Sequence, residues 1–251
     1  MLSQAKFILS KSKLNEQYKV ASNYADIVSY SFKTNQIVGK ELEQISDCMF
    51  SVHSIQSVEQ LKHPERIWFF TQAPSKKELK ILYKKNINKF VVDNKKDLKI
   101  LLNYVKEYNF DIELLLRMKL KEHTIHTGKH FVYGMYSSQV NELLKKLKNN
   151  SNIKKLGIHF HRKTQNTSEW SLKQEIKESI ETSNLQILDY INIGGGIPSV
   201  YKNYSPKILE GIFSKILDLK KSLTKIGIKM IIECKNSPTE IAREYMTIIS
   251  L

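Results

Sequence analysis

The stretch Tyr30-Ser31-Phe32-Lys33-Thr34-Asn35 decides how the rest of the chain is interpreted. It continues the apolar run Ala25–Tyr30, whose β-branched and aromatic residues predict a strand, and it ends in a Thr-Asn pair typical of a helix start. Lys33 therefore stands at the carboxyl end of a predicted strand. A lysine in that place is either a solvated charge at the edge of the core or an amine held for covalent chemistry such as a Schiff base.

Four later predicted strands also end in chemically useful groups, which favours the second interpretation. These groups are Arg117, the pair His159 and His161, the run Gly194-Gly195-Gly196, and Glu233. Side chains from several strand ends converge when parallel strands close into a ring. We therefore expect one site at the carboxyl end of a barrel.

Short β-branched runs alternate with amphipathic stretches along the chain, which is the pattern of a (β/α)8 barrel. The predicted strands are residues 6–10, 25–30, 48–53, 66–71, 89–93, 111–118, 154–161, 186–193 and 229–233. The predicted helices are residues 11–20, 37–45, 55–61, 76–85, 95–108, 138–148, 168–182 and 206–226. Counted from the lysine strand, eight strands remain for the barrel. An open doubly wound sheet fits less well, because no GxGxxG motif opens the first strand-to-helix turn.

The two ends of the chain depart from this alternation. We expect residues 1–24 to form a strand and a helix leading into the barrel, and residues 25–240 to form the barrel itself. Residues 241–251 are predicted to begin a truncated C-terminal β-domain. We expect that their apolar run, Tyr245–Leu251, either pairs with the N-terminal strand near Phe7-Ile8-Leu9 or starts a domain that the chain has lost.

Length and composition indicate a globular protein that can bury a large core, and one domain is as plausible as two. The 251 residues match the size of a single β/α barrel, which is about 250 residues. No apolar run is long enough to span a membrane and the N-terminus lacks a cleavage signature, so we expect a cytoplasmic protein. Cys48 and Cys234 have no CxxC or Cys/His spacing, which favours buried reduced thiols over a disulfide or a metal site.

The formal net charge of +15 raises the question of nucleic acid binding. The lysines are scattered over most of the predicted helices and cluster only as doublets such as Lys76-Lys77 and Lys145-Lys146. The sequence has neither zinc-finger spacing nor a ribonucleoprotein aromatic motif. A solvated basic exterior explains the charge better, and we expect no nucleic acid partner.

The chain carries an ordered series of motifs: SYSFKTN, RIWFFTQAPSKKEL, KFVVDN, LLLRM, LGIHFHRKTQ, INIGGGIP and IIEC. In order and spacing they resemble the barrel domain of the fold-type III pyridoxal 5'-phosphate (PLP) decarboxylases. That group acts on ornithine, arginine, diaminopimelate and carboxynorspermidine. The resemblance covers nearly the whole chain, and it implies a TIM barrel of the alanine racemase/ornithine decarboxylase type whose usual C-terminal β-domain is absent or truncated.

The resemblance implies that PLP is the cofactor and gives its ring four protein neighbours. Lys33 matches the lysine that forms the internal aldimine, and His161 matches the histidine that stacks on the pyridine ring. Glu233 matches the acid that pairs with the ring nitrogen and makes the ring a better electron sink. Arg117 matches an arginine beside the ring, unless it forms an ordinary salt bridge. His159 matches a variable position and is equally well explained as a core histidine.

The expected phosphate site is where the chain departs most from the family. Gly194, Gly195 and Gly196 match the phosphate loop, and Thr164 matches a serine that hydrogen-bonds phosphate. However, the family's Pro-Gly-Arg after the glutamate is replaced by Cys234-Lys235-Asn236, which removes a cation from the phosphate.

Two further departures from the family pattern lie nearby. Arg162 and Lys163 follow the stacking histidine, and Ser51 replaces an acid after the second strand. We expect Lys163, one step nearer Thr164, to substitute for the missing arginine; the alternative is that both cations belong to exposed salt bridges.

The resemblance implies a PLP-dependent decarboxylase of a basic or diamino amino acid, in amino-acid or polyamine metabolism. Its reaction would run by transaldimination from Lys33, loss of the α-carboxylate and reprotonation. The expected partners are an amino-acid substrate and either a second copy of the chain or a complementing β-domain, which supplies the substrate contacts in the family. No metal is expected. Two alternatives are a non-catalytic PLP-binding barrel and an inactive interaction protein that kept the fold.

Overall fold

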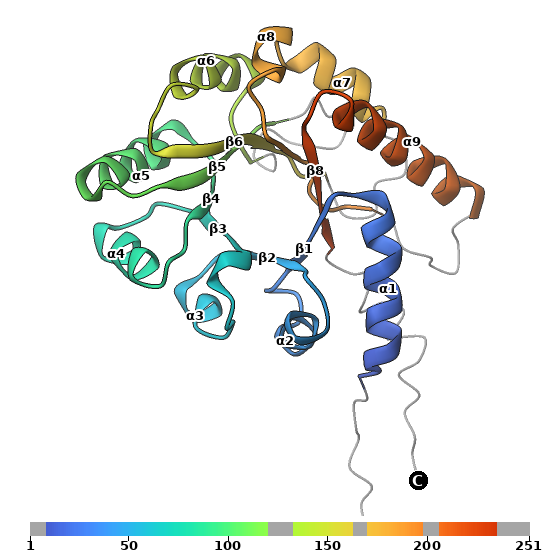
Figure 1. Cartoon of the computed structure of the whole chain (residues 1–251). Coiled ribbons are helices and arrows are strands. Elements are labelled where there is room, and N and C mark those ends of the chain that lie inside the picture. The colour runs from blue at the N-terminus through green and yellow to red at the C-terminus, as the bar shows by residue number, and fades with distance from the viewer. Residues whose placement is uncertain (1–8, 120–132, 163–169, 198–205, 235–251) are drawn as a thin grey trace, which may run out of the picture.

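The computed structural model describes residues 9–119, 133–162, 170–197 and 206–234 (Figure 1). Eight parallel strands follow one another in chain order. They close into a barrel, because the first strand, β1 (Ile27–Ser31), pairs with both β2 (Met49–Val52) and the last strand, β8 (Lys229–Cys234). The predicted fold class is therefore confirmed. Residues 6–8 of the first predicted strand and the final run, residues 245–251, lie outside the described residues, as do Lys163 and Thr164.

The strands are short apolar runs rich in β-branched and aromatic residues. Such runs suit parallel sheets, which are covered on both faces. In β3, for example, all five residues are buried. The strands are β1 Ile27–Ser31, β2 Met49–Val52, β3 Ile67–Thr71, β4 Lys89–Val92, β5 Ile112–Arg117, β6 Ile153–His159, β7 Tyr190–Asn192 and β8 Lys229–Cys234.

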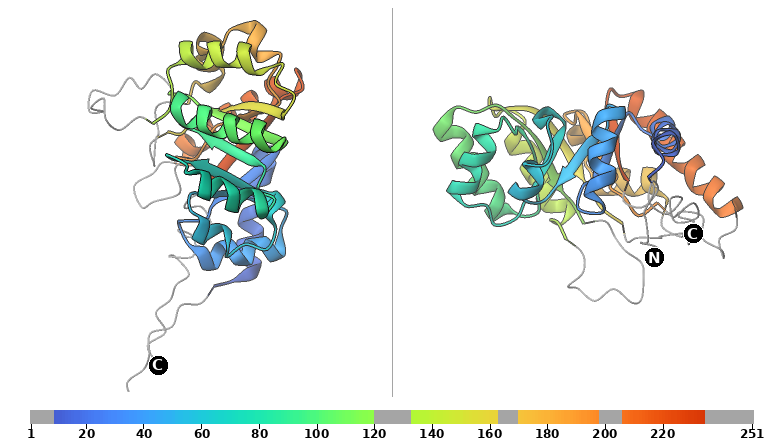
Figure 2. Two further views of the ribbon diagram at one scale, coloured as in Figure 1. Left: turned by 90° about the vertical axis from the view of Figure 1, so that its left-hand side faces the viewer. Right: turned by 90° about the horizontal axis from the view of Figure 1, so that it is seen from below.

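Helices surround the barrel on its outside (Figures 1 and 2). The helix after the first strand begins where the Thr-Asn pair predicted it: Asn35 accepts hydrogen bonds from the backbone N–H groups of Ile37 and Val38, at 3.0 and 3.3 Å. None of the described helices is long and apolar enough to cross a membrane. The helices are α1 Lys11–Tyr24, α2 Gln36–Ile45, α3 Ile55–Val58, α4 Lys76–Lys84, α5 Lys95–Tyr108, α6 Ser137–Leu147, α7 Leu172–Ser179, α8 Thr182–Leu185 and α9 Pro206–Thr224, with a 3-10 turn at Pro64–Arg66.

The helix predicted over residues 168–182 is only partly present: within its described part α7 ends at Ser179, and a second short helix, α8, begins at Thr182. The buried side chain of Asn141 on α6 binds both sides of the break. Its Nδ2 donates to the Ser179 carbonyl at 2.8 Å, and its Oδ1 accepts from the Glu181 N–H at 3.0 Å. Because these bonds satisfy backbone groups that the break leaves open, a long-range contact overrides the local helical pattern.

Two strand predictions are also corrected. The strand predicted over residues 186–193 is only Tyr190–Asn192, because residues 186–189 belong to the turn that follows α8. The described part of the first predicted strand, Leu9 and Ser10, is not a strand; Ser10 instead caps α1 by accepting from the Lys13 N–H at 3.4 Å. Both cysteines are free thiols, Cys48 buried and Cys234 partly buried.

Alternate residues of each strand point into the barrel. The buried cluster inside it consists of Trp68, Phe70, Val91, Leu115 and Ile231, whereas the larger core lies between strands and helices. Because side chains alternate with a period of two, the next inward positions toward the carboxyl ends can be read from this cluster. They are the buried polar residues Ser29, Ser51, His159, Asn192 and Glu233. The barrel therefore changes from apolar to polar at the end where a site is expected.

Candidate functional site

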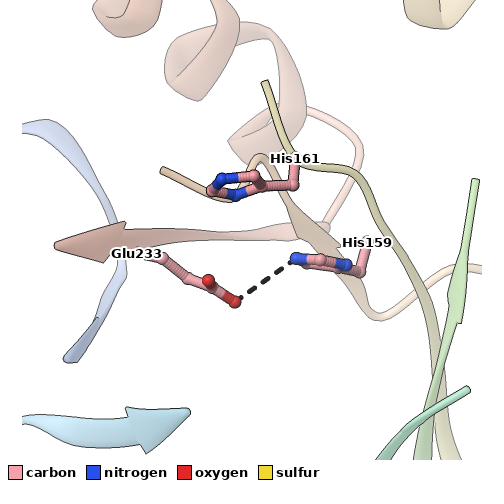
Figure 3. Close-up of side chains that lie close together, drawn as sticks. All are labelled: His159, His161 and Glu233. Atoms are coloured by element: carbon pink, nitrogen blue, oxygen red, sulfur yellow. Dashed lines mark ion pairs between the residues drawn. The ribbon is translucent and has the colours of Figure 1, made fainter. Parts of the chain in front are cut away.

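A carboxylate and two imidazoles meet at the carboxyl end of the barrel (Figure 3). Glu233 comes from the end of β8 and His159 from the end of β6, and His161 lies two residues beyond that strand. Glu233 Oε1 lies 3.3 Å from His159 Nε2, and the three side chains bring nitrogen or oxygen atoms within 4.8 Å of one another. Glu233 is 5% exposed and His159 1%, whereas His161 is partly open to solvent.

The ionisation of Glu233 is set by its neighbours. Burial by itself raises the pKa of the Glu233 carboxyl, but His159, His161 and the Ser51 hydroxyl together lower that pKa by more. Burial lowers the pKa of His159, and the nearby carboxylate of Glu233 only partly opposes this effect. At neutral pH the cluster thus holds an ionised Glu233 beside a neutral His159, a buried negative charge at the centre of the barrel mouth.

Asn192 on β7 is a site residue that the sequence interpretation missed. Its side chain is fully buried, and its Nδ2 donates to Glu233 Oε1 at 3.2 Å. Its Oδ1 accepts from the Gly194 N–H at 2.8 Å. The signal was available, since Asn192 is the polar residue of an otherwise apolar strand end, YINI, immediately before the glycine run.

The glycine run turns where only glycine fits. Gly194 has φ +66° and Gly196 has φ +87°, in the left-handed region. A Cβ atom at Gly194 would lie 2.2 Å from the Phe160 carbonyl oxygen. Two of the N–H groups expected to face an anion are engaged within the protein: that of Gly194 with Asn192, and that of Gly195 with His161 Nδ1 at 3.1 Å. The phosphate role of the run stays a prediction.

The bond from Gly195 also fixes the state of His161. Because Nδ1 accepts a hydrogen bond, the neutral ring carries its proton on Nε2. Two histidines and a carboxylate have the composition of a metal site, but a metal-bound imidazole ordinarily donates its second N–H instead of accepting there. This arrangement favours an organic ligand over a metal ion.

Lys33 lies on the turn that follows β1 and is exposed. The turn is tied down on both sides, because the Thr34 N–H donates to the Ser31 carbonyl at 3.0 Å and the Phe32 N–H donates to the Ser51 carbonyl at 3.1 Å. Lys33 follows Ser29 and Ser31 at a spacing of two, the spacing of the inward positions of β1. The amine is therefore carried by a short, anchored segment at the rim of the barrel.

Arg117 ends β5 and forms a largely buried ion pair with Asp93. Its Nη1 lies 3.2 Å from Asp93 Oδ2, and its guanidinium lies 5.3 Å from the centre of the Tyr133 ring. It is paired in register with His159, which places it at the level of the cluster. The salt bridge foreseen as an alternative is present, and the role beside a cofactor ring remains a prediction.

Arg162 is buried on the helix side of β6. Its Nη2 lies 2.6 Å from Glu175 Oε2 on α7, and its guanidinium lies 5.8 Å from the centre of the Trp170 ring. The pair is buried, at 3% exposed for Arg162, so the expectation of an exposed salt bridge is wrong for this residue. Lys163 and Thr164, the other proposed phosphate contacts on this loop, lie outside the described residues.

Residues 38–235 match the family model described as "Pyridoxal-dependent decarboxylase, pyridoxal binding domain". The chain belongs to this family. The matched segment includes Arg117, His161, the glycine run and Glu233, and it begins after Lys33.

Solved structures of several decarboxylases share the fold. Diaminopimelate decarboxylase from Helicobacter pylori, complexed with L-lysine, superposes with a TM-score of 0.76 at 18% identity over 94% of this chain and 64% of that one. Diaminopimelate decarboxylase from M. jannaschi gives 0.70 at 20% identity over 90% and 59%. The lysine/ornithine decarboxylase from Vibrio vulnificus, complexed with cadaverine, gives 0.67 at 19% identity over 90% and 60%.

The coverage in these comparisons is uneven. The chain is almost wholly matched but spans only about three fifths of each solved structure, between 59% and 64%. No curated protein sequence matches the chain.

The described residues fit the cofactor that a pyridoxal-binding domain implies. A protonated pyridine nitrogen needs a buried anionic partner, and Glu233 is one. An aromatic ring needs a flat neighbour at the mouth, and His161 is held in one orientation by Gly195. A covalent bond to the cofactor aldehyde needs an accessible amine at the rim, which Lys33 provides.

Gly194→Ala is expected to destabilise the domain by about 2–4 kcal/mol. The new Cβ would combine left-handed backbone strain with a clash against a backbone oxygen that has no freedom to move. Denaturant unfolding measures the loss. Gly211→Ala is the control, since a Cβ there meets no atom within 4 Å and alanine favours the helix α9. Equal stabilities of the two variants would contradict the strain assigned to the turn.

Proposed function

We propose that the chain is the cofactor-binding part of a PLP-dependent decarboxylase that acts on a basic or diamino amino acid. The observation that carries the proposal is the buried carboxyl of Glu233, 3.3 Å from His159, at the mouth of a barrel that belongs to the pyridoxal-binding family. The substrate class is supported by the structural relatives, which are decarboxylases of lysine, ornithine and diaminopimelate. Because these structures are less than 25% identical to this chain, they show a shared fold, and the substrate class is our proposal.

Each residue of the site would have a distinct role toward the cofactor. When bound, pyridoxal phosphate supplies a ring that accepts the electron pair left by the departing carboxylate. Glu233 would hold a proton on the ring nitrogen, and His161 would cover one face of the ring. Lys33 would tether the cofactor through its amine and release it to the amino group of the substrate. Arg117, Lys163, Thr164 and the glycine run would hold the ring edge and the phosphate.

A second copy of the chain or a complementing β-domain would complete the site. The solved relatives are longer than the matched region, and the extra length is the natural source of substrate contacts. We expect the complete protein to be a homodimer or a two-part complex in the cytoplasm.

The test is CO2 release from ornithine, arginine, lysine and diaminopimelate, with PLP added and with any neighbouring β-domain supplied. Release from one of these substrates supports the proposal. A visible absorbance band from bound cofactor without CO2 release would replace it by the non-catalytic PLP-binding barrel. Neither cofactor binding nor CO2 release would leave the inactive interaction protein.

For the phosphate, we expect Lys163→Ala to weaken PLP binding about tenfold to a hundredfold, because a charge-assisted hydrogen bond contributes about 1.5–3 kcal/mol. Arg162→Ala should instead lower stability with little change in affinity, since Arg162 is already paired with Glu175. Lys173→Ala, which removes an outer cation paired with Asp218, is the control. Cofactor titration measures all three affinities. Parent-like affinity of Lys163→Ala would assign Lys163 to the basic exterior and would contradict its phosphate role.

A further inference from the structure

The side chain of Asn192 joins the two halves of the site. It lies fully buried at the end of β7, between the Glu233 carboxylate and the glycine run. Its amide nitrogen donates to Glu233 Oε1 at 3.2 Å, and its amide oxygen accepts from the Gly194 N–H at 2.8 Å. The Asn192 amide thus donates to Glu233, which is proposed to bind the ring nitrogen, and accepts from the glycine turn, which is proposed to bind the phosphate.

Two further hydrogen bonds, both donated by backbone N–H groups, extend this connection. The Glu233 N–H donates to the Gly194 carbonyl at 2.8 Å, so the carboxylate residue and the turn are bound through both side chain and backbone. The next residue, Gly195, donates to His161 Nδ1 at 3.1 Å. A continuous chain of hydrogen bonds therefore runs from Glu233 through Asn192 and the turn to the proposed stacking histidine.

The chemistry at position 192 requires a group that donates on one side and accepts on the other. A carboxylate of the same shape would still accept from Gly194, but it would place a second negative charge against Glu233. An apolar side chain would leave the Gly194 N–H without this acceptor in a buried place, which is costly. Asparagine satisfies both neighbours with one planar group.

We propose that Asn192 is a positioning residue of the cofactor site, which orients Glu233 with its amide nitrogen and holds the glycine turn with its amide oxygen. This inference rests on the proposed function, because it assigns both neighbours to PLP. Asn192 itself would act through Glu233 and Gly194 and not through contact with the reacting atoms.

The first measurement uses the cofactor-free chain. Asn192→Asp, Glu233→Gln and the double variant are compared by thermal unfolding at neutral pH. The single change at Asn192 sets two carboxylates against each other, whereas the double variant restores an amide-carboxylate pair with the roles exchanged. We expect the double variant to recover most of the melting temperature lost in Asn192→Asp. If the loss of melting temperature in the double variant equals the sum of the losses in the two single variants, the two side chains do not interact, and the inference is overturned.

The second measurement is PLP affinity, which a purely structural role would not change. Asn192→Asp should bind PLP about tenfold or more weakly at a temperature where it is fully folded. Asn184→Asp is the control: Asn184 is equally buried, at 2% exposed, and donates to Asn141 between α8 and α6. It should lose stability without losing affinity. Parent-like affinity of Asn192→Asp would overturn the positioning role.

The two measurements separate this inference from the proposed function. If the parent chain does not bind PLP, the proposed function and the positioning role both fail, while the unfolding comparison still decides whether Asn192 holds Glu233. If Asn192→Asp does not fold, Asn192→Ala replaces it, since alanine introduces no buried charge. The loss of melting temperature caused by Glu233→Gln should then differ between the parent and the Asn192→Ala variant. Equal losses in the two would overturn the inference.

Discussion

Glu233→Gln is expected to keep PLP bound at saturating concentration and to lower the rate of decarboxylation by several powers of ten. Glutamine has nearly the same shape, and its oxygen can still accept from Asn192, so the barrel mouth should remain folded. What it lacks is the negative charge that would hold a proton on the ring nitrogen. Without that proton the ring is a weaker electron sink in the step that releases CO2.

The measurement is CO2 release by the complete, active form of the protein, with bound cofactor followed separately by absorbance. Glu43→Gln is the control, because Glu43 is also buried, at 6% exposed, but lies on α2, outside the barrel, where it accepts hydrogen bonds from the backbone N–H groups of Lys62 and His63. It should alter stability and leave turnover unchanged. Turnover of Glu233→Gln equal to the parent would move the protonating role to another group.

The barrel could be predicted because its strands follow a local rule. A run such as Ile67–Thr71 is apolar throughout and too short for a helix, and helix starts such as Asn35 are marked by a capping side chain. The break between α7 and α8 could not be predicted in this way. It depends on Asn141, whose side chain reaches from α6 to Ser179 and Glu181, about forty residues along the chain.

The candidate site was predictable where the alternation of strand residues could be followed. His159 ends β6, and His161, two positions later, points to the same side of the chain, whereas Arg162 packs against Glu175. Applied to β7, the same rule would have found Asn192. The partner of Arg117 was harder to foresee, because Asp93 belongs to another strand end and the pairing depends on how β4 and β5 are registered.

Lys33→Arg is expected to abolish covalent attachment of PLP while keeping the charge at the rim. A primary amine can form an imine with the cofactor aldehyde, whereas the guanidinium of arginine stays protonated at neutral pH and does not. The motivation is the place of Lys33, exposed on an anchored turn after β1, at the same spacing as the inward residues Ser29 and Ser31. Attachment should therefore depend on this one amine among the many lysines of the chain.

Reduction of the PLP-loaded parent with borohydride, followed by peptide mapping, should place the pyridoxyl label on Lys33. Lys33→Arg should show no label there and should lose the visible absorbance of the tethered cofactor, whereas PLP should still bind reversibly through the groups around Glu233. Lys40→Arg is the control, since Lys40 is an exposed lysine on α2, the helix that follows the same turn. It should be labelled at Lys33 like the parent. A specific label on a different lysine in the parent would show that the rim turn after β1 does not carry the cofactor, and the tethering amine would then have to be sought at another strand end.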